Sequence, residues 1–592
     1  MLGFLSVGHV ESVEDGNGAS DSTDPADFDF FGLVDLCYCA VGDNPSRLSG
    51  ISRPQYCILD DLLAPQLPFF ARCNFQEYLM AMKKLLSRRD FLKLLAIMPA
   101  LLTEGRVAKG IRSGKGHPNV IILVCDAMSA RHLSLYGYPR KTSPNMERFA
   151  SHATVYHSHY SGGNFTATGT ASLLTGTYPW THRALHYASL IDEDIKNHNL
   201  FNLAGGDSFR VGYAQNPWVD LFLYQFVEAV DKHIPTGAFN LSTHLYYDKI
   251  FSHDPLISYK AIDEFALQNH LPAGSSFVAM LQKLQTVKSI KDFAATYKEQ
   301  FPYGVPYIFN GNSDLPSYFV EDVFDGLIAT IERLPHSSSL AYFHIYPPHA
   351  PCLPRKDFAD TFKDDGWSPM EKPKHPLGDG LGFDYIVDQL HFYDEYIAEL
   401  DAEFGRLHDF MSGKGIFEES YVILTSDHGE LFERGTVAHL TPLLYEEVIK
   451  IPLIISAPGQ KSQQDIFTPT SSVDLVPTLL ELLGRPVSKV TEGKTLPGLG
   501  GEGRTEDAIY IVEAKENSAF TPISRASIAM VKGQYKLIRY SYPDFQEYEL
   551  YDLRNDPEEL NDLAGVHPKL FSGMQAELLE KLDRVNTPFA HE

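Results

Sequence analysis

Short apolar runs that alternate with helix-period patterns constrain the fold of this chain more than any other feature. The run at 120–125 is continuous and of strand length, which is typical of a strand buried on both faces of a parallel sheet. Further strands are predicted at 210–214, 340–346, 421–425 and 451–456. Apolar residues recur at helical spacing over 144–153, 320–334, 393–407 and 473–483. This alternation predicts an α/β fold, with a mixed, mostly parallel central sheet flanked by helices.

The pattern divides the chain into a large α/β domain at 117–500 and a smaller C-terminal α+β subdomain at 504–592. A glycine-rich stretch near 498–503 marks the linker, and an amphipathic helix is predicted near 570–585. Residues at about 230–315 break the βα rhythm. They are either an insertion near the mouth of a site or a packing elaboration of the large domain.

The charge of the chain excludes two classes of partner. Its 592 residues carry 50 basic and 76 acidic side chains, for a formal net charge of −26. Such a chain lacks the basic footprint that nucleic acid or anionic lipid requires. A negatively charged substrate must therefore be bound by a metal ion or by a few locally placed cations. A disulfide framework is excluded too, because only Cys125 and Cys352 lie beyond the first 81 residues.

A segment typical of an export signal lies inside the chain, at 82–109. It combines a basic start, a short apolar run and the heptad SRRDFLK at 87–93, which resembles a twin-arginine signal. The alternative is a short amphipathic helix with a basic end. Because export signals act at an N-terminus, we expect translation to begin at Met80 or Met82 and the leading segment 1–81 to be an artefact of start-site choice. The protein is then exported by the twin-arginine machinery to the periplasm, cell surface or medium; N-terminal sequencing that began upstream of Met80 would contradict this.

Polar side chains follow three of the predicted strands at their carboxyl ends, where open α/β sheets bind ligands. These side chains are Asp126, the pair Asp427 and His428, and His349. One aspartate and an Asp-His pair supply oxygen and nitrogen ligands that suit a single divalent cation. Each residue alone could be a helix cap or a solvated side chain, but three such places on one rim favour a metal site.

A polar loop that enters a helix lies at 162–176. Its sequence, GGNFTATGTASLLTG, predicts a helix that begins near Thr166 and ends near Gly176. A hydroxyl at a helix N-terminus meets free backbone N–H groups and the positive end of the helix dipole, which suits an attacking oxygen and an anionic substrate. A threonine that only caps the helix is the alternative.

These motifs resemble, in the same order, those of the sulfatase family within the alkaline-phosphatase superfamily. The opening strand, metal aspartate and first helix of that family are similar to PNVIILVCDAMSARHLSLYGYPRKTSPNMERFA at 118–150. Its nucleophile helix resembles ASLLTGTYPWTHRA, and its second metal motif resembles SDHGELFERGTVAHLTPLLYEEVIKIPLIISAPG. Its C-terminal strand and turn resemble ELYDLRNDPEELNDLA. The resemblance runs from about 118 to the end of the chain and implies a sulfatase-like catalytic domain at 117–500.

The resemblance also implies roles for individual residues. It implies one divalent metal ion (Ca²⁺, Mn²⁺ or Zn²⁺) bound by Asp126, Thr166, Asp427 and His428. Thr166 falls at the position of the family's nucleophile. His349 matches the histidine of the family's H-x-P motif, and His439 matches the histidine after Asp-His-Gly-Glu; either could bind the oxyanion of the substrate or protonate the leaving group. His182 is implied to be either a support for the nucleophile helix or purely structural.

The chain departs from the family at the nucleophile. Typical sulfatases carry C-x-P-x-R, whose cysteine becomes formylglycine, whereas this chain has TATGT at 166–170. A sulfated threonine lacks the elimination route of a formylglycine hydrate, but a phosphothreonine can be attacked at phosphorus. Threonine here resembles the phosphodiesterase branch and the phosphoglycerol- and phosphoethanolamine-transferase branches. We therefore expect a metal-dependent hydrolase or transferase of phosphate or sulfate esters that prefers phosphoesters and forms a covalent Thr166 intermediate.

Two alternatives remain open at this point. One is a sulfuric ester hydrolase that works without formylglycine; the other is an inactive exported protein that binds anions. Ser129 replaces the family's arginine, although Arg131 lies two residues further on, and no lysine occurs between His439 and Lys450. The expected substrate is a small anionic ester, with a glycan or a lipid head group among the candidates.

Overall fold

The computed structural model describes residues 117–239, 295–308, 317–336, 338–503 and 507–590. The leading segment 1–81 and the export signal expected at 82–109 lie outside these residues, as does most of the stretch 230–315. None of the helices within the described ranges combines the length and the apolarity needed to cross a membrane.

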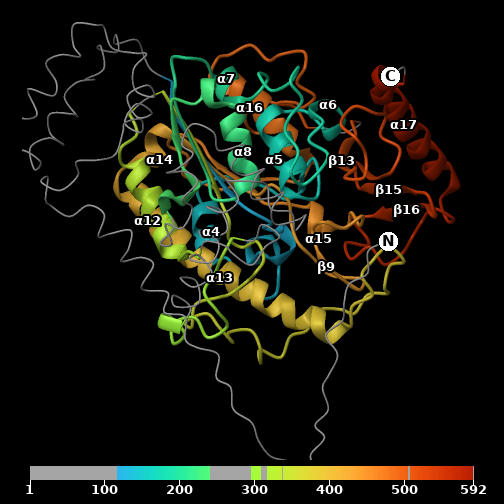
Figure 1. Cartoon of the computed structure of the whole chain (residues 1–592), viewed down its shortest axis with the longest axis horizontal. Coiled ribbons are helices and arrows are strands. Elements are labelled where there is room, and N and C mark those ends of the chain that lie inside the picture. The colour runs from blue at the N-terminus through green and yellow to red at the C-terminus, as the bar shows by residue number, and fades with distance from the viewer. Residues whose placement is uncertain (1–116, 240–294, 309–316, 337, 504–506, 591–592) are drawn as a thin grey trace, which may run out of the picture. The chain divides into compact units, whose positions relative to one another are not determined.

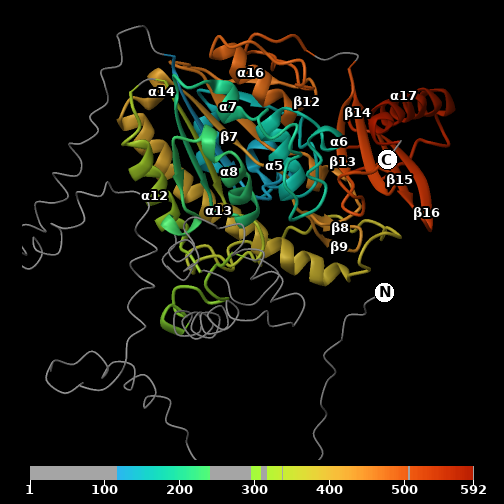
Figure 2. The ribbon, with the colours of Figure 1, turned by 45° about the horizontal axis from the view of Figure 1, so that its top comes forward.

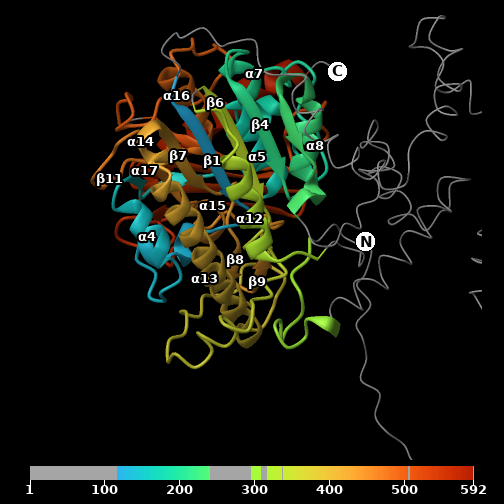
Figure 3. The same ribbon diagram turned by 90° about the vertical axis from the view of Figure 1, so that its left-hand side faces the viewer.

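A mixed sheet organises the large domain (Figures 1 and 3). Its strands in chain order are β1 (Asn119–Cys125), β2 (Thr154–Tyr156), β4 (Phe209–Ala214), β5 (Lys232–Ile234), β6 (Ser339–Ile345), β7 (Ser420–Thr425), β10 (Leu453–Ser456) and β11 (Gln464–Ile466). The order across the sheet is β11-β2-β10-β7-β1-β6-β4-β5. The strands from β7 to β5 are parallel to one another, and β10 is antiparallel to both of its neighbours. The predicted fold class is therefore confirmed.

Helices cover both faces of this sheet, because successive side chains of a strand point to opposite faces (Figure 2). On β1, Ile121 and Leu123 belong to the core on one face, and Ile122 and Val124 to the core on the other. The first core is covered by α4 (Pro144–Ala150), α12 (Val320–Ile331) and α13 (Phe383–Gly413). The second is covered by α5 (Thr166–Thr175), α7 (Leu200–Ala204), α8 (Pro217–Gln225) and α16 (Leu475–Leu482).

The C-terminal subdomain is an antiparallel sheet with one long helix. Its strands are β13 (Ile509–Glu513), β14 (Ala526–Lys532), β15 (Tyr535–Tyr542) and β16 (Phe545–Asp552), and its helix is α17 (Pro568–Asn586). Met574 and Leu578 of α17 pack in the same core as Trp180 of the large domain. The backbone N–H of Val512 in β13 donates to the carbonyl of Gly162 at 3.0 Å, so the subdomain supports the loop that leads into α5.

The remaining described elements are short. They are β3 (His159–Tyr160), β8 (Leu431–Glu433), β9 (Thr436–Ala438), β12 (Thr470–Ser471), α6 (Pro179–His182), α14 (Ile416–Glu419) and α15 (Glu446–Ile449). The β8–β9 hairpin matters most for function, because it connects two of the conspicuous polar motifs of the sequence.

Three sequence expectations need correction. The helix expected at 393–407 is only the middle of α13, whose ends have a polar, partly exposed surface that weakens the apolar pattern. The helix expected at 473–483 starts with a 3₁₀ turn, Ser472–Asp474, before α16. The irregular stretch begins later than residue 230, because β5 still pairs in parallel with β4. This edge strand is short and starts with an exposed lysine, so the sequence shows no apolar run there.

Candidate active site

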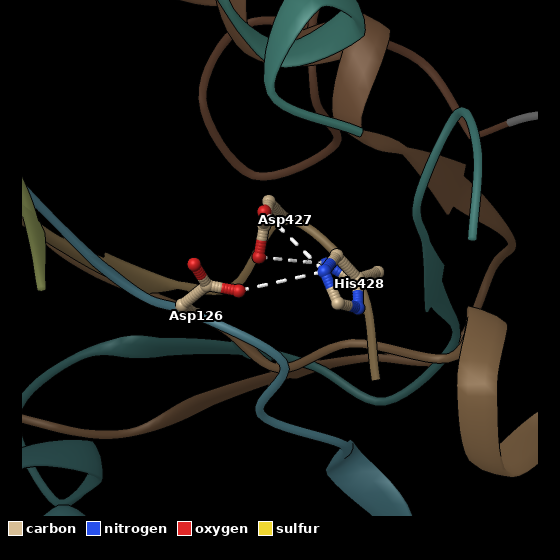
Figure 4. A group of neighbouring side chains, drawn as sticks. All are labelled: Asp126, Asp427 and His428. Atoms are coloured by element: carbon tan, nitrogen blue, oxygen red, sulfur yellow. Dashed lines mark hydrogen bonds and ion pairs between the residues drawn. The ribbon is translucent and has the colours of Figure 1, made fainter. Parts of the chain in front are cut away.

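The carboxyl ends of β1 and β7 bring three of the predicted metal ligands together. The two strands are paired in parallel, with Val124 opposite Thr425, so the residues that follow them meet at one edge of the sheet. Asp126, Asp427 and His428 each offer a ligand atom there, and these atoms all lie within 4.8 Å of one another (Figure 4). All three side chains are buried.

The electrostatics of this cluster are those of a cation site. Burial and the charge of Asp126 raise the pKa of Asp427. Burial alone would also raise the pKa of Asp126, but the histidines around it, His349 foremost, hold that pKa well below its usual range. Burial opposes protonation of His428, yet the two carboxylates raise its pKa to about 9. The two buried carboxylates thus favour a positive charge beside them, whether a protonated imidazole or a metal ion.

The residues of the cluster fit a divalent cation. Oδ1 of Asp126 and Nε2 of His344 are buried and make no hydrogen bond. Nδ1 of His428 donates to the carbonyl of Gly429 at 2.8 Å, so in the neutral ring, the form that binds a metal, Nε2 carries its lone pair toward the carboxylates, 3.4 Å from Asp126 Oδ1. Buried carboxylates are stable only when they are paired or bound to a metal. The donor set of two carboxylates and an imidazole suits Mn²⁺, Zn²⁺ or Ca²⁺.

Thr166 is the first residue of α5 and points into the cluster. The N-cap of α5 is Phe165, and no side chain caps this helix end. The capping role considered for Thr166 is therefore wrong. Its Oγ1 instead lies 3.3 Å from Nε2 of His428 and 3.5 Å from Nδ2 of Asn216.

His349 and His439 lie beside the cluster, as the sequence motifs implied. Their ring centroids are 4.8 Å apart, and the ring of His439 is 4.6 Å from that of His428. Nδ1 of His349 donates to the carbonyl of Ala350 at 2.6 Å, and Nδ1 of His439 donates to Glu430 Oε2 at 2.9 Å. In both rings Nε2 is therefore the nitrogen that can meet a substrate. The β8–β9 hairpin begins after Glu430 and ends before His439, which explains their contact.

Burial and neighbouring charges act on His349 and on Glu430, the partner of His439. Burial lowers the pKa of His349, and His439 adds to this shift while Asp126 opposes it, so protonation of this ring is disfavoured. Burial would raise the pKa of Glu430, but His439 holds it below its ordinary value, so the carboxylate stays ionised beside that ring.

Sequence reasoning missed three residues of the site. Nδ2 of Asn216 donates to Asp126 Oδ2 at 2.6 Å, Nε2 of His344 lies 3.3 Å from the same oxygen, and Glu430 orients His439. Asn216 follows the predicted strand at 210–214 closely, so the strand-end rule could have found it. His344 lies inside an apolar strand. The sequence does not show whether the side chain of a single histidine there points toward the site.

Two other residues that the motifs singled out have structural contacts. His182 is buried: its Nε2 lies 3.1 Å from Ser172 Oγ, and its Nδ1 accepts from the N–H of Ala184 at 3.1 Å. These contacts join α5 to the turn after α6, so His182 supports the helix that begins at Thr166. Arg131 forms an ion pair with Glu558 of the C-terminal subdomain.

Gly169 in α5 is required by the close approach of the loop that carries Asp427. A Cβ at this position would lie 2.2 Å from the carbonyl oxygen of Asp427. Gly169→Ala favours the helix by about 1 kcal/mol, but it must push α5 and the Asp427 loop apart. We expect it to lower metal affinity and activity at least tenfold, as measured by metal titration and ester turnover. Gly413→Ala at the end of α13 is the control, since nothing lies within 4 Å of its Cβ; an equal loss there would contradict this reasoning.

Comparisons with known proteins agree with this geometry. The family model described as Sulfatase matches residues 118–485, and the model N-sulphoglucosamine sulphohydrolase, C-terminal, matches 441–587. The choline-sulfatase of Rhizobium meliloti (strain 1021) is 24% identical over 478 residues, which cover 76% of this chain and 83% of that protein. Arylsulfatase K of Xenopus laevis is 30% identical over 204 residues, which cover 33% of this chain and 38% of that protein.

Solved structures support the fold at low sequence identity. The phosphonate monoester hydrolase of Agrobacterium radiobacter is 19% identical, with a TM-score of 0.55 and coverage of 79% of this chain and 96% of that one. A protein solved with its substrate D-glucosamine-2-N,6-O-disulfate is 17% identical, with a TM-score of 0.56 and coverage of 80% of this chain and 100% of that one. Because the sulfatase model matches more than half of the 592 residues, the chain belongs to the sulfatase family and is an ester hydrolase of the alkaline-phosphatase superfamily.

Proposed function

We propose that this protein is a metal-dependent hydrolase of monoanionic phosphoesters and phosphonate esters, with Thr166 as its nucleophile. One observation carries the proposal: the Thr166 hydroxyl, free of any capping bond, lies against His428 and Asn216 at the edge of the carboxylate cluster. The chain has a threonine where formylglycine chemistry needs a cysteine. Phosphorus accepts a second nucleophilic attack after the threonine ester forms.

The metal would be held by Asp126, Asp427 and His428, with the Thr166 oxygen beside them. When bound, such an ion supplies Lewis-acid charge to ester oxygens and to a nucleophilic oxygen. Asn216 positions this assembly, because its amide donates to Asp126 and also reaches Thr166. Thr166 Oγ1 then bonds to phosphorus as the ester oxygen leaves, and water attacks phosphorus to release Thr166.

His439 is the residue best placed to protonate the leaving oxygen. The ionised Glu430 accepts from its Nδ1 and so orients its Nε2 toward the site, whereas burial disfavours protonation of His349. Because Nδ1 of His349 donates to Ala350, the neutral ring can only accept a hydrogen bond at Nε2, from a hydroxyl group or a water at the site. Of the two histidines that the sequence left open, this proposal assigns the acid role to His439.

Replacing Glu430 by glutamine should lower kcat about tenfold to 100-fold, since His439 loses the carboxylate that holds its ring in place. The effect should be larger for esters with poor leaving groups, because these depend more on protonation of the leaving oxygen. Activities of both proteins across pH, with a good and a poor leaving group, test this. An equal loss for both leaving groups would mean that Glu430 supports only the fold.

The charges at the site support a monoanionic substrate. The strongest electrostatic partners of Asp126, Asp427 and Glu430 are histidines and one another, with no lysine or arginine among them. A divalent cation would offset the two aspartates and leave little positive charge for a dianion. We therefore favour phosphodiesters and phosphonate monoesters over phosphomonoesters.

The stereochemistry at phosphorus tests the covalent step. Two successive in-line displacements, by Thr166 and then by water, give net retention, whereas one direct attack by water gives inversion. We expect retention when a phosphorothioate diester that is chiral at phosphorus is hydrolysed in isotope-labelled water. Inversion would remove the threonine ester from the mechanism.

Export remains part of the proposal and is supported by the twin-arginine-like heptad at 87–93. Replacing Arg88 and Arg89 by lysine should leave the protein in the cytoplasm, as fractionation of cells that express the full chain would detect. Unchanged export of that variant would contradict a twin-arginine route.

A further inference from the structure

A buried asparagine ties the loop before α5 to the segment that follows the β8–β9 hairpin. Nδ2 of Asn164 donates to the carbonyl of His439 at 2.7 Å and to the carbonyl of Thr441 at 2.7 Å. Both amide hydrogens of this side chain are thus used on one short segment, 439–441. Because Asn164 is fully buried, solvent does not compete for these two bonds.

The hydrogen bonds determine which way this amide faces. Oδ1 of Asn164 is buried and makes no hydrogen bond within the described part of the chain. The opposite orientation would bring Oδ1 against the carbonyl oxygens of His439 and Thr441, where three acceptors would repel one another. The side chain therefore gives up an acceptor bond to make two donor bonds. A buried polar atom without a partner costs folding free energy, which indicates that residue 164 serves more than the stability of the fold.

Asn164 lies close to the nucleophile along the backbone. It precedes Phe165, the N-cap of α5, and Thr166, the first residue of that helix. Two residues span at most about 7 Å, so the amide and the Thr166 hydroxyl belong to the same short stretch of chain. Phe165 is packed in the core on one face of the sheet, which holds this stretch in place.

The other end of the link is the residue that the proposed function makes the acid. Nδ1 of His439 donates to Glu430, which sets the orientation of the ring. The carbonyl of His439 accepts from Asn164, which sets the position of the backbone that carries the ring. Segment 439–441 comes after β9 and lies in no helix or strand, so no regular ladder of backbone bonds fixes it.

We propose that Asn164 is a positioning residue, which fixes the distance between the nucleophile Thr166 and the acid His439. This inference rests on the proposed function, in which Thr166 attacks and His439 protonates the leaving oxygen. The attacking and leaving oxygens of a phosphoryl transfer lie roughly in line, so the spacing of the two groups must match the length of the transition state. The amide of Asn164 links them directly, without passing through a metal ligand.

The dependence of the rate on the leaving group tests this role. Asn164→Ala should lower kcat about tenfold or more for phenyl phenylphosphonate, but no more than about threefold for 4-nitrophenyl phenylphosphonate, whose better leaving group needs less protonation. The KM values should change less than about twofold, because the substrate-binding groups remain. Asn164→Leu keeps the branched shape of the side chain without its donors and should behave in the same way. Since both rates come from one preparation, their ratio does not depend on how much of a variant is folded.

Two further variants separate positioning from a general loss of structure. Asn517→Ala is the control: Asn517 also donates to two backbone carbonyls, those of Ala514 and Arg525 in the C-terminal subdomain, and its loss should leave the ratio unchanged. In a His439→Ala background, Asn164→Ala should not change the ratio any further, because the acid on which it acts is gone. An equal loss for both leaving groups in Asn164→Ala, or a full additional change in the double variant, would overturn the proposal.

The same experiment distinguishes this inference from the proposed function. If only sulfate esters are turned over, the proposed function is wrong, whereas the ratio for phenyl and 4-nitrophenyl sulfate tests Asn164 in the same way. If His439→Ala leaves the ratio unchanged, His439 is not the acid and this inference falls with that assignment. A changed ratio for His439→Ala but not for Asn164→Ala would overturn this inference alone.

Discussion

Replacing Thr166 by alanine should reduce turnover of every ester substrate by about 1,000-fold or more, while the fold and the metal content change little. The side chain supplies the attacking oxygen in the proposed reaction, so no other group can form the covalent intermediate. Its hydroxyl makes no capping bond in α5, and helix stability should therefore be preserved. Steady-state kinetics, metal analysis and thermal unfolding of the purified variant check the three parts of this expectation.

Two control variants separate chemistry from packing. Thr168 lies two residues after Thr166 in the same helix, and its hydroxyl donates to the carbonyl of Phe165 at 2.9 Å. Thr168→Ala should therefore retain most of the activity. Thr166→Ser keeps a hydroxyl at this position and should retain part of the activity. If Thr166→Ala stays active and Thr168→Ala does not, the nucleophile is misassigned.

Asp427→Asn should have opposite effects on the metal-free and the metal-bound protein. Folding raises the pKa of Asp427, so above its unfolded value of about 4 the ionised carboxyl costs folding free energy. In the absence of metal the variant should therefore unfold at a higher Tm than the unchanged protein at neutral pH, and the gain should vanish in acid. With metal the order of the two Tm values should reverse, because the variant loses a charged ligand. At a metal concentration 100 times Kd, binding raises the free energy of unfolding of the unchanged protein by about 2.7 kcal/mol.

Thermal unfolding with a chelator and with added Mn²⁺ or Zn²⁺ provides the measurement. Asp325→Asn, on the exposed end of an ion pair with Arg406, is the control, and its response to metal should equal that of the unchanged protein. The same metal-induced rise in Tm for Asp427→Asn and the unchanged protein would contradict the assignment of Asp427 as a ligand.

The strand ends were the most predictable part of the site. Continuous apolar runs located β1 and β7, and the rule that ligands bind at carboxyl ends placed Asp126, Asp427 and His428 together without any contact information. The helical pattern likewise located α5 and put Thr166 at its start. These predictions succeeded because local periodicity and strand direction together determine where such side chains lie.

The contacts made across the sheet were not predictable in the same way. Glu430 meets His439 only because the short β8–β9 hairpin turns the chain back, and no turn signal as strong as Asn-Gly marks it. His344 reaches Asp126 from inside β6, and only the register of β1 with β6 shows that they meet. The bond from Asn164 to the carbonyl of His439 joins residues 275 apart in sequence, which no local pattern connects.

The most direct test of the central claim compares two esters with the same leaving group. The kcat/KM values of 4-nitrophenyl phenylphosphonate and 4-nitrophenyl sulfate should be measured side by side, with Ca²⁺, Mn²⁺ and Zn²⁺ in turn. If Thr166 acts as a phosphoryl acceptor, the phosphonate should be the better substrate by at least about tenfold with the most active metal. A sulfate ester that is turned over faster than the phosphonate would contradict the claim and make the protein a sulfatase that works without formylglycine.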